Sequence, residues 1–368
     1  MKKKILYILG TLNAGGTENY VLRFINYCGN QEFEWHVLSL EEKKSDLDDQ
    51  FLKAGCNIIY QSISYFNPVK FWKFYRLVKR EKFDTVCTFN GNFGGIPQTI
   101  ARIAGVQKRI VWHRRSSNAF GNNIMKRAYN GIVNLLIRIN ATKILSNSQH
   151  ALNVFYGKYQ KNDERFKVIP NGVNQDIVKT KLTKSEARKK YGISDDVFLV
   201  GHVGRYNPAK NHHTIFKVAQ KLQEKELGIH FLFCGSGTDS NDFKKKIQQH
   251  GIEDICHCLG LVDDVAAIYK SLDLFYFPSV TEGQPNALIE AMLTGVPVLP
   301  SNIPPILEVL PDKSKKNCCN ATDVYSSVES IISIIQEEVS KDTFIYQMWA
   351  QNKFDDKINF EMFKKTLD

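Results

Sequence analysis

The chain repeats an alternation of short apolar strands and amphipathic helices twice, and this repetition limits its possible fold more than any other feature. Strands of the first half are expected at 4–9, 34–40, 57–60, 85–89, 109–113 and 143–146. Helical patterns lie between several of them, at 17–28, 66–82, 94–104 and 121–140. Strands that alternate with helices form a parallel sheet with helices on both faces. The first half therefore predicts a doubly wound α/β domain.

The alternation begins again after a turn-rich segment at 169–174. Strands are expected at 198–203, 230–234, near 256, at 273–277 and at 296–300, with helices at 212–224, 241–249 and 286–293. Helical stretches at 321–339 and 343–366 close the chain. The 368 residues exceed a usual single domain. We therefore predict an N-terminal domain at 1–172 and a C-terminal domain at 173–349.

Two glutamates, Glu282 and Glu290, lie eight positions apart across a strand-to-helix turn of the second half. Pro285 suits the start of the helix, whose unpaired first-turn N–H groups favour an anion. These donors would belong to Asn286, Ala287 and Leu288. Carboxylates accept hydrogen bonds from sugar hydroxyls. The pattern predicts a bound pyrophosphate, with a sugar near one glutamate and a ribose near the other.

These residues resemble the E-x7-E signature of retaining glycosyltransferases with the GT-B fold, the large group called family 4. In that family the first glutamate contacts the donor sugar, the intervening amides hold the diphosphate and the second glutamate binds the ribose. The resemblance gives these roles to Glu282, to the segment containing Gly283, Gln284, Asn286, Ala287 and Leu288, and to Glu290. An ordinary amphipathic helix with an exposed glutamate at each end is the alternative.

The resemblance also implies a fold. Its members have two facing Rossmann-like doubly wound domains with an interdomain cleft, and their last helix crosses back to the first domain. We therefore assign residues 350–368 to the N-terminal domain.

The loop after the first strand of the second half carries two cations, Arg205 and Lys210, five positions apart. Arginine binds phosphate through its planar fork and lysine as a point charge, so together they can clamp two phosphates. The family has a similar G-R-x4-K arrangement that neutralises the leaving diphosphate. The resemblance places Gly204, Arg205 and Lys210 at the donor site, and two simple surface charges are the alternative.

Glycine turns supply further candidates. Gly15 and Gly16 follow the first strand and open a helix, where glycine lets the backbone approach a phosphate or sugar. Family 4 has a similar G-G-x-E loop that faces the donor phosphates. Gly235 resembles the family's turn below the nucleotide, and Leu261 lies in a segment whose backbone faces the base. A structural turn is the alternative for each.

His113 ends a first-domain strand, the end at which ligands enter such sheets. A family histidine in this setting contacts the donor sugar through its backbone or its ring. We therefore group His113 with Glu282, Arg205 and Lys210 as catalytic candidates. A satisfied structural histidine is the alternative.

The first half carries the whole net positive charge of the chain. Residues 1–170 hold 26 basic and 12 acidic residues, a balance of +14, whereas the remaining 23 basic and 26 acidic residues give −3, which together account for the net +11. An anionic partner is expected on the first half. No nucleic-acid recognition motif accompanies this charge, so no nucleic acid is expected. A basic surface that only aids solubility is the alternative.

Two basic, apolar segments of the first half fit contact with an acceptor or an anionic membrane surface. The segment 68–80 has helical spacing and fits a membrane surface or packing on its own sheet, and we prefer packing. The segment 114–138 follows His113 directly and is the preferred acceptor or membrane candidate. Its basic residues are Arg114, Arg115, Lys126, Arg127 and Arg138.

The eight cysteines include no C-x-x-C pair, so a zinc site is not expected. The glycosyltransferase hypothesis below requires neither a metal nor a cofactor. No apolar run approaches the ~20 residues of a membrane-spanning helix. The first ten residues resemble a signal peptide only superficially, because their apolar run is short and no convincing cleavage site follows. A cytoplasmic protein is expected, with peripheral contact at the inner face of the cell membrane.

These patterns and the resemblance predict a metal-independent, retaining glycosyltransferase of surface polysaccharide assembly. It would move a hexose or N-acetylhexosamine from a UDP- or GDP-linked donor to a lipid-linked or oligosaccharide acceptor. A nucleotide-sugar epimerase of the same fold and a noncatalytic nucleotide-sugar or polyanion-binding protein are the alternatives. Where many relatives have a Gly-Gly-x-x-Glu turn, this chain has Ser301-Asn302-Ile303-Pro304-Pro305 before Glu308, which leaves the role of Glu308 open.

Overall fold

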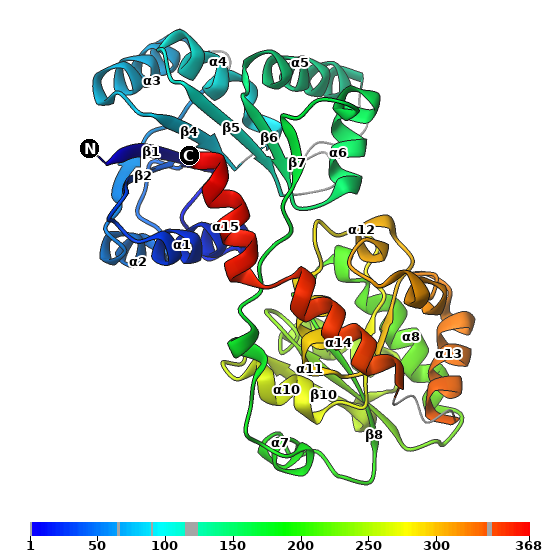
Figure 1. The fold of residues 1–368 in the computed structure, drawn as a ribbon. Helices are drawn as coiled ribbons and strands as arrows, with labels where there is room; N and C mark the ends of the chain where they lie inside the picture. Colours follow the sequence, from blue (N-terminus) through cyan, green and yellow to red (C-terminus); the bar gives the residue numbers. More distant parts are fainter. Residues whose placement is uncertain (1, 65–66, 90, 115–123, 337–340) are drawn as a thin grey trace. The chain divides into compact units, whose positions relative to one another are not determined.

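A computed structural model gives the fold of the protein and describes residues 2–64, 67–89, 91–114, 124–336 and 341–368 (Figure 1). The chain forms two compact units, Met1–Asn171 with Lys357–Asp368, and Gly172–Asp356. Each unit is built on a sheet in which all paired strands are parallel. The predicted architecture of two doubly wound α/β halves is confirmed.

The first sheet has seven strands in the order β3-β2-β1-β4-β5-β6-β7. These strands are β1 (Lys3–Leu9), β2 (Phe33–Ser39), β3 (Asn57–Tyr60), β4 (Thr85–Thr88), β5 (Lys108–His113), β6 (Lys143–Ser146) and β7 (Phe166–Val168). The central strands β1, β4 and β5 are almost wholly buried. Such burial on both faces explains why they read as continuous apolar runs.

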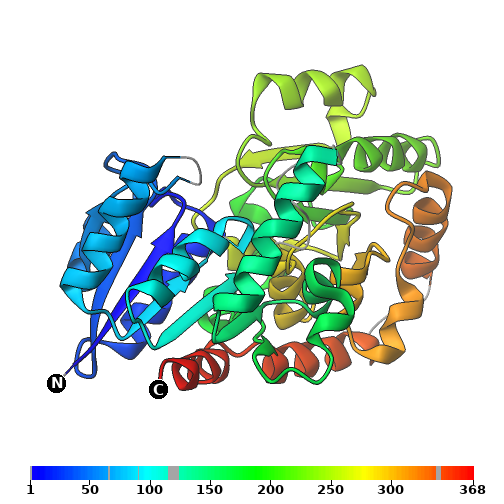
Figure 2. The ribbon, with the colours of Figure 1, turned by 90° about the horizontal axis from the view of Figure 1, so that it is seen from above.

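Helices cover both faces of the first sheet. One core joins α1 (Gly16–Cys28) and the C-terminal helix α15 (Asp356–Leu367) to β1 and β2. On the opposite face lie α3 (Pro68–Glu81), α4 (Gly95–Ile103) and α5 (Ile124–Asn140) (Figures 1 and 2). The short helices α2 (Asp48–Lys53) and α6 (Gln149–Tyr156) complete the unit. Neither short helix was among the elements expected from the sequence.

The second sheet has the order β10-β9-β8-β11-β12. Its strands are β8 (Phe198–Val203), β9 (Ile229–Cys234), β10 (Cys256–Gly260), β11 (Leu274–Phe277) and β12 (Val298–Pro300). One core packs α8 (His212–Gln223), α9 (Asn241–Gln249) and α13 (Val324–Gln336) against one face. A second core packs α10 (Val265–Ser271), α11 (Asn286–Thr294) and α14 (Lys341–Lys353) against the other. Two short helices, α7 (Lys184–Lys190) and α12 (Pro304–Leu307), complete the unit.

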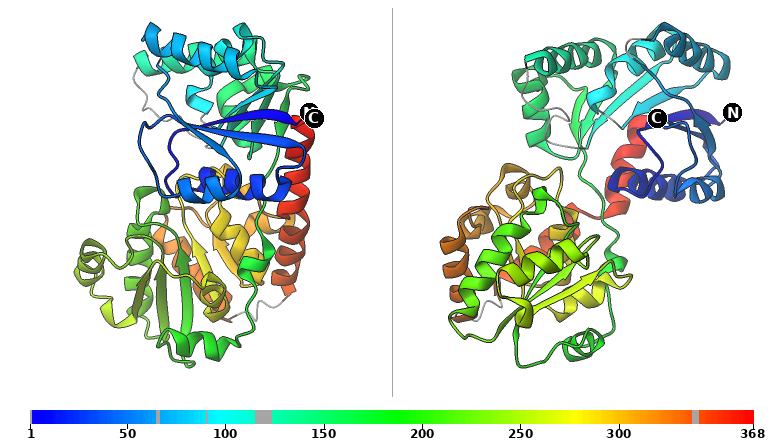
Figure 3. Two further views of the ribbon diagram at one scale, coloured as in Figure 1. Left: turned by 90° about the vertical axis from the view of Figure 1, so that its left-hand side faces the viewer. Right: turned by 180° about the vertical axis from the view of Figure 1, so that it is seen from behind.

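The single helix expected at 343–366 is instead two helices, α14 and α15. Phe354 lies in the break and is buried in the second unit's core with Ala350. The return to the first unit therefore begins at Lys357 rather than at residue 350. From there α15 lies beside the first unit's sheet (Figure 3), and Phe363 stacks its ring edge on Trp112 at a centroid distance of 4.4 Å.

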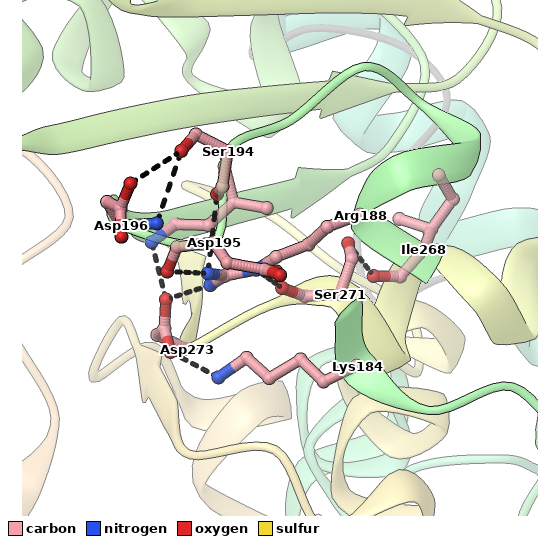
Figure 4. Close-up of polar contacts among 9 residues, drawn as sticks. Lys184, Arg188, Ser194, Asp195, Asp196, Ile268, Ser271 and Asp273 are labelled. Carbon is pink, nitrogen blue, oxygen red and sulfur yellow. Dashed lines mark hydrogen bonds and ion pairs between the residues drawn. The ribbon is translucent and has the colours of Figure 1, made fainter. Parts of the chain in front are cut away.

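A buried ion pair ties α7 to the amino edge of the second sheet (Figure 4). The Arg188 guanidinium is paired with Asp273, which directly precedes β11, and also donates to the Ser271 carbonyl at 3.0 Å. Lys184 also pairs with Asp273. The cavity of about 420 Å³ beside Lys184 and Asp273 lies at this amino edge, whereas ligands of open parallel sheets bind at the carboxyl edge, so we assign no ligand to it.

Candidate active site

The topological switch point of the second sheet lies between β8 and β11. These strands are neighbours, yet β8 leads to α8 on one face and β11 leads to α11 on the other. In open parallel sheets, ligands bind outside the carboxyl ends of the strands at such a point. The loop after β8 carries Lys210 and the loop after β11 carries Glu282, so two predicted site residues lie there.

Hydrogen bonds hold these two loops together. The Val280 amide donates to the Ala209 carbonyl at 2.9 Å. The Asn211 side-chain amide donates to the Pro278 carbonyl at 3.1 Å. Because Asn211 adopts a left-handed conformation with φ of 57°, it ends the short 3-10 turn Pro208–Lys210 and begins α8.

Lys210 and Glu282 form an ion pair, with Nζ 2.6 Å from Oε1. The two side chains are only 18% and 10% exposed. The ammonium also lies over the Phe277 ring, 4.6 Å from its centroid. Partial burial weakens solvent screening of the pair. The structure thus joins the predicted phosphate-binding cation directly to the predicted sugar-binding carboxylate.

Gly204 and Gly235 bring the loops after β8 and β9 into close contact. The Gly204 amide donates to the Cys234 carbonyl at 2.8 Å. A Cβ atom on Gly235 would lie 2.4 Å from the Gly204 carbonyl oxygen, and Gly235 has a φ of +138°. Both the contact and the dihedral require glycine at 235. Arg205 extends from this tight backbone as an exposed side chain.

The loop after β10 joins the same edge. The Gly235 amide donates to the Gly260 carbonyl at 2.7 Å. Leu261, the next residue, is exposed. The predicted base-facing segment therefore adjoins the predicted nucleotide turn.

Helix α11 begins at Asn286, directly after Pro285, and no side chain caps this end. Its first-turn amides and dipole favour an anion at the end nearest Glu282. Glu290 lies one turn into the helix, where Tyr269 Oη is 2.9 Å from Glu290 Oε2. Burial, and then the Glu290 charge, raise the pKa of Tyr269 well above its usual range, so the phenol keeps its proton and donates.

In the first unit, Gly15 precedes α1 and Gly16 is its first residue. A Cβ atom on Gly16 would meet nothing within 4 Å, whereas one on Gly15 would meet only the flexible end of Glu18 below 3 Å. Neither glycine is required by packing alone. Open space at Gly16 is compatible with the predicted approach of a ligand to this backbone.

His113 ends β5 as predicted, but its ring is buried. Its Nε2 lies 2.7 Å from the Tyr156 hydroxyl, and its ring stacks on Phe155. Burial lowers the pKa of His113 to about 3, so the ring is neutral at physiological pH. These contacts give the ring a structural role, and a contact with the donor sugar stays a prediction.

The preferred acceptor segment, 114–138, is only partly within the described residues. The Arg114 guanidinium lies 4.0 Å from the Tyr20 ring centroid, and burial lowers the pKa of Arg114 to about 10. Arg138 lies 3.6 Å from the Tyr159 ring centroid. Arg115 and the side chains of Lys126 and Arg127 lie outside the described part of the chain.

Within the described ranges, no three histidine, cysteine, aspartate or glutamate side chains are grouped to hold a metal ion. The helices that the structure describes include none with the length and apolar character needed to cross a bilayer.

Both halves of the chain match glycosyltransferase family models. The model described as glycosyltransferase family 4 matches residues 14–177, and the one described as glycosyl transferases group 1 matches residues 183–350. The chain belongs to the family 4 glycosyltransferases.

Two bacterial glycosyltransferases are similar to this chain over most of their length. This glycosyltransferase is 29% identical over 308 residues to the capsular polysaccharide biosynthesis glycosyltransferase CapH of Staphylococcus aureus, covering 82% of this chain and 81% of CapH. It is 27% identical over 313 residues to the UDP-Gal:alpha-D-GlcNAc-diphosphoundecaprenol alpha-1,3-galactosyltransferase of Escherichia coli, covering 82% and 80%.

A solved structure shares the fold. Anabaena Alr3699/HepE, crystallised with UDP and glucose, superposes with a TM-score of 0.81 over 99% of each chain at 18% identity. The likeness confirms the GT-B fold expected from the sequence.

The structure brings the second-domain candidates of this glycosyltransferase to one edge of one sheet. Sequence reasoning missed Tyr269 beside Glu290, and Asn207 and Asn211, which shape the turn before α8. No sequence pattern pointed to Tyr269, because its helix lies before β11 and carries no motif. The asparagines lie in the same loop as Arg205 and Lys210, but their capping role depends on the fold.

Proposed function

We propose that this protein is a retaining, metal-independent glycosyltransferase that moves a hexose or N-acetylhexosamine from a nucleotide diphosphate sugar to a lipid-linked or oligosaccharide acceptor. The observation that carries the proposal is the Lys210–Glu282 ion pair at the switch point of the second sheet. It supplies a cation for phosphate and a carboxylate for a sugar hydroxyl at one place.

Positive charge around this pair suits a diphosphate leaving group. Lys210, Arg205 and the amino end of α11 each favour an anion. Charge develops on the diphosphate as the glycosidic bond breaks, and preorganised cations stabilise that charge. These protein groups perform the neutralisation for which other enzymes use a metal, which supports a site without metal or cofactor.

Glu282 and Glu290 complete the donor site in this proposal. Glu282 binds a sugar hydroxyl, and Glu290 binds the ribose. Gly204, Gly235 and the Leu261 segment form the backbone around the nucleotide. Retention follows from front-face attack, in which the leaving phosphate accepts the acceptor's proton.

The relatives support a UDP-linked donor and a lipid-linked acceptor. The Escherichia coli relative is named for UDP-Gal and for an acceptor linked to diphosphoundecaprenol. We propose the same classes for this chain, with GDP-linked donors as the alternative. The enzyme would act in the cytoplasm, at the inner face of the cell membrane, with its basic N-terminal half toward anionic lipid.

The proposal is tested by nucleotide binding followed by turnover. Titration with UDP and GDP first selects the base, and release of that nucleotide from its hexose donor is then followed with a lipid-diphosphate-linked N-acetylhexosamine acceptor. Lys210→Met should lower turnover by about 100-fold or more, because one preorganised charge at the leaving group is lost. The exposed Lys217 on α8 offers a matched control, and Lys217→Met should leave turnover unchanged.

Normal turnover by Lys210→Met would overturn the assignment of the site. Binding of neither nucleotide would overturn the proposed function itself. Conversion of the donor to an epimer without acceptor would identify the epimerase alternative, and the anomeric configuration of the product tests retention.

A further inference from the structure

Tyr269 joins the glutamate of α11 to the first turn of the same helix. Its hydroxyl lies 2.9 Å from Glu290 Oε2 and 3.0 Å from the Ala287 carbonyl oxygen. Tyr269 itself is 1% exposed, and its ring packs edge-on against Phe275 of β11 at a centroid distance of 5.6 Å. The phenol is therefore fixed by the core on one side and by α11 on the other.

The two contacts define where the Glu290 carboxylate lies. Ala287 is three residues earlier, so a hydroxyl that reaches both atoms keeps the carboxylate one turn back along α11. Helical side chains already tilt toward the amino end of their helix. The carboxylate is thus held toward the end of α11 at which the diphosphate is proposed to bind.

We propose that Tyr269 is a positioning residue that orients Glu290 for the ribose hydroxyls of the donor. The inference rests on the proposed function, because it requires a nucleotide at this edge. Tyr269 donates one hydrogen bond to one carboxylate oxygen. A carboxylate has about four acceptor positions, so one bond from Tyr269 is compatible with bonds to the ribose hydroxyls.

The burial of Tyr269 indicates that it positions Glu290 and does not bind the substrate directly. A side chain that is 1% exposed does not offer its hydroxyl to a ligand from solution. Phenylalanine at 269 would keep the packing against Phe275 and remove only the hydroxyl. The Glu290 carboxylate would then lose this restraint, and part of its bond to the ribose would be lost.

The test compares a ribonucleotide with one that lacks the ribose hydroxyls. UDP and 2′,3′-dideoxy-UDP, or the GDP pair if GDP is the nucleotide selected, are titrated calorimetrically into wild type and Tyr269→Phe. Tyr269→Phe should weaken binding of the ribonucleotide about 10-fold, the upper range for one hydrogen bond. Binding of the dideoxynucleotide should not change.

Tyr276→Phe is the matched control. Tyr276 is a fully buried tyrosine of the same unit, whose hydroxyl donates to Ser327 Oγ at 2.8 Å. Its variant should leave binding of both nucleotides unchanged. A double-mutant cycle combines Tyr269→Phe with Glu290→Ala. Adding Tyr269→Phe to Glu290→Ala should cause no further loss of nucleotide affinity, because the effects of residues that act through one another are not additive.

An equal loss for both nucleotides would overturn the inference, since it would indicate a general disturbance of α11. Unchanged binding of the ribonucleotide to Tyr269→Phe would also overturn it, while leaving the proposed function intact. If wild type binds no nucleoside diphosphate, the proposed function fails first. Melting temperatures of the variants establish that each is folded at the titration temperature.

Discussion

Lys210 and Glu282 are 72 positions apart in the sequence, yet their charged atoms are 2.6 Å apart. Tyr269 and Glu290 are 21 positions apart, yet Tyr269 Oη lies 2.9 Å from Glu290 Oε2. At the scale of the residue, the proposed donor site consists of such pairs, in which one partner sets the position or the charge of the other. A substitution of either partner therefore changes the remaining one as well.

Buried imidazoles give the protein an acid-sensitive stability. Burial lowers the pKa of His113 to about 3 and that of His212 to about 4, against about 6.5 in an unfolded chain. Below pH 6.5 the unfolded state therefore binds protons that the folded state does not. Linkage requires the free energy of unfolding to fall as the pH falls from 6.5 toward 4, by up to about 1.4 kcal/mol per pH unit for each histidine.

Denaturant unfolding at pH 7.5, 6.5 and 5.5 measures this slope. His113→Gln keeps a side chain able to reach the Tyr156 hydroxyl and removes the titrating ring. The decrease of its unfolding free energy per pH unit should be smaller than that of wild type by up to about 1.4 kcal/mol, the contribution of one proton. An unchanged slope would show that His113 is protonated in the folded state.

At the scale of the element, the two edges of the second sheet differ in how accessible their charged side chains are. The carboxyl edge carries exposed or partly exposed charges such as Arg205 and Lys210. At the amino edge, Arg188 and Asp273 form an ion pair in which the arginine side chain is 4% exposed (Figure 4). Charges buried in this way secure α7 to the sheet, because neither can be left without its partner.

Asp273→Ala should lower the free energy of unfolding by about 3–5 kcal/mol, because it leaves the buried Arg188 charge without its carboxylate. Lys184→Met is the control. Lys184 contacts the same carboxylate but is 44% exposed, so its loss should cost less than about 1 kcal/mol. Denaturant unfolding measures both values.

Nucleotide affinity of the folded Asp273→Ala protein should match wild type, because the pair lies at the amino edge. A reduced affinity without a loss of stability would contradict the structural role of this pair.

At the scale of the whole molecule, charge and apolar exposure coincide on the first half. Residues 1–170 carry the balance of +14. On α5 of the first unit, Ile132, Leu135 and Ile139 are exposed, and their spacing of three and four places them on one face. An apolar face on a basic unit fits an anionic bilayer surface.

Vesicles containing anionic phospholipid should therefore sediment the protein, and raising the salt from about 0.05 to 0.5 M should weaken the binding because the electrostatic part is screened. Replacing Ile132 and Ile139 by Asn should reduce the bound fraction. Leu227 is an exposed leucine of the second unit, and Leu227→Asn serves as the control. Equal binding by all three proteins would exclude α5 as the membrane contact.

The amino-acid sequence by itself determined the local features of this protein. The two runs of alternating strands and helices gave the fold class, since periodicity depends on neighbouring residues alone. The spacing of Glu282 and Glu290 and of Arg205 and Lys210 was enough to identify the family. The ends of the expected elements agree with the structure to within a few residues, except at Phe354, where packing in the second core divides one expected helix into two. The sequence pattern did not predict the short strand β7 or the short helices α2, α6, α7, α10 and α12.

Only the tertiary structure decided which side chains meet. The order of parallel strands places the ends of β8 and β11 side by side, and no local pattern specifies that order. The Lys210–Glu282 pair and the Tyr269–Glu290 hydrogen bond both depend on it. The burial of His113 likewise depends on Phe155 and Tyr156 of α6, a helix that the sequence pattern did not predict. Contacts between distant residues follow from topology and packing, whereas sequence spacing fixes only the direction of neighbouring side chains.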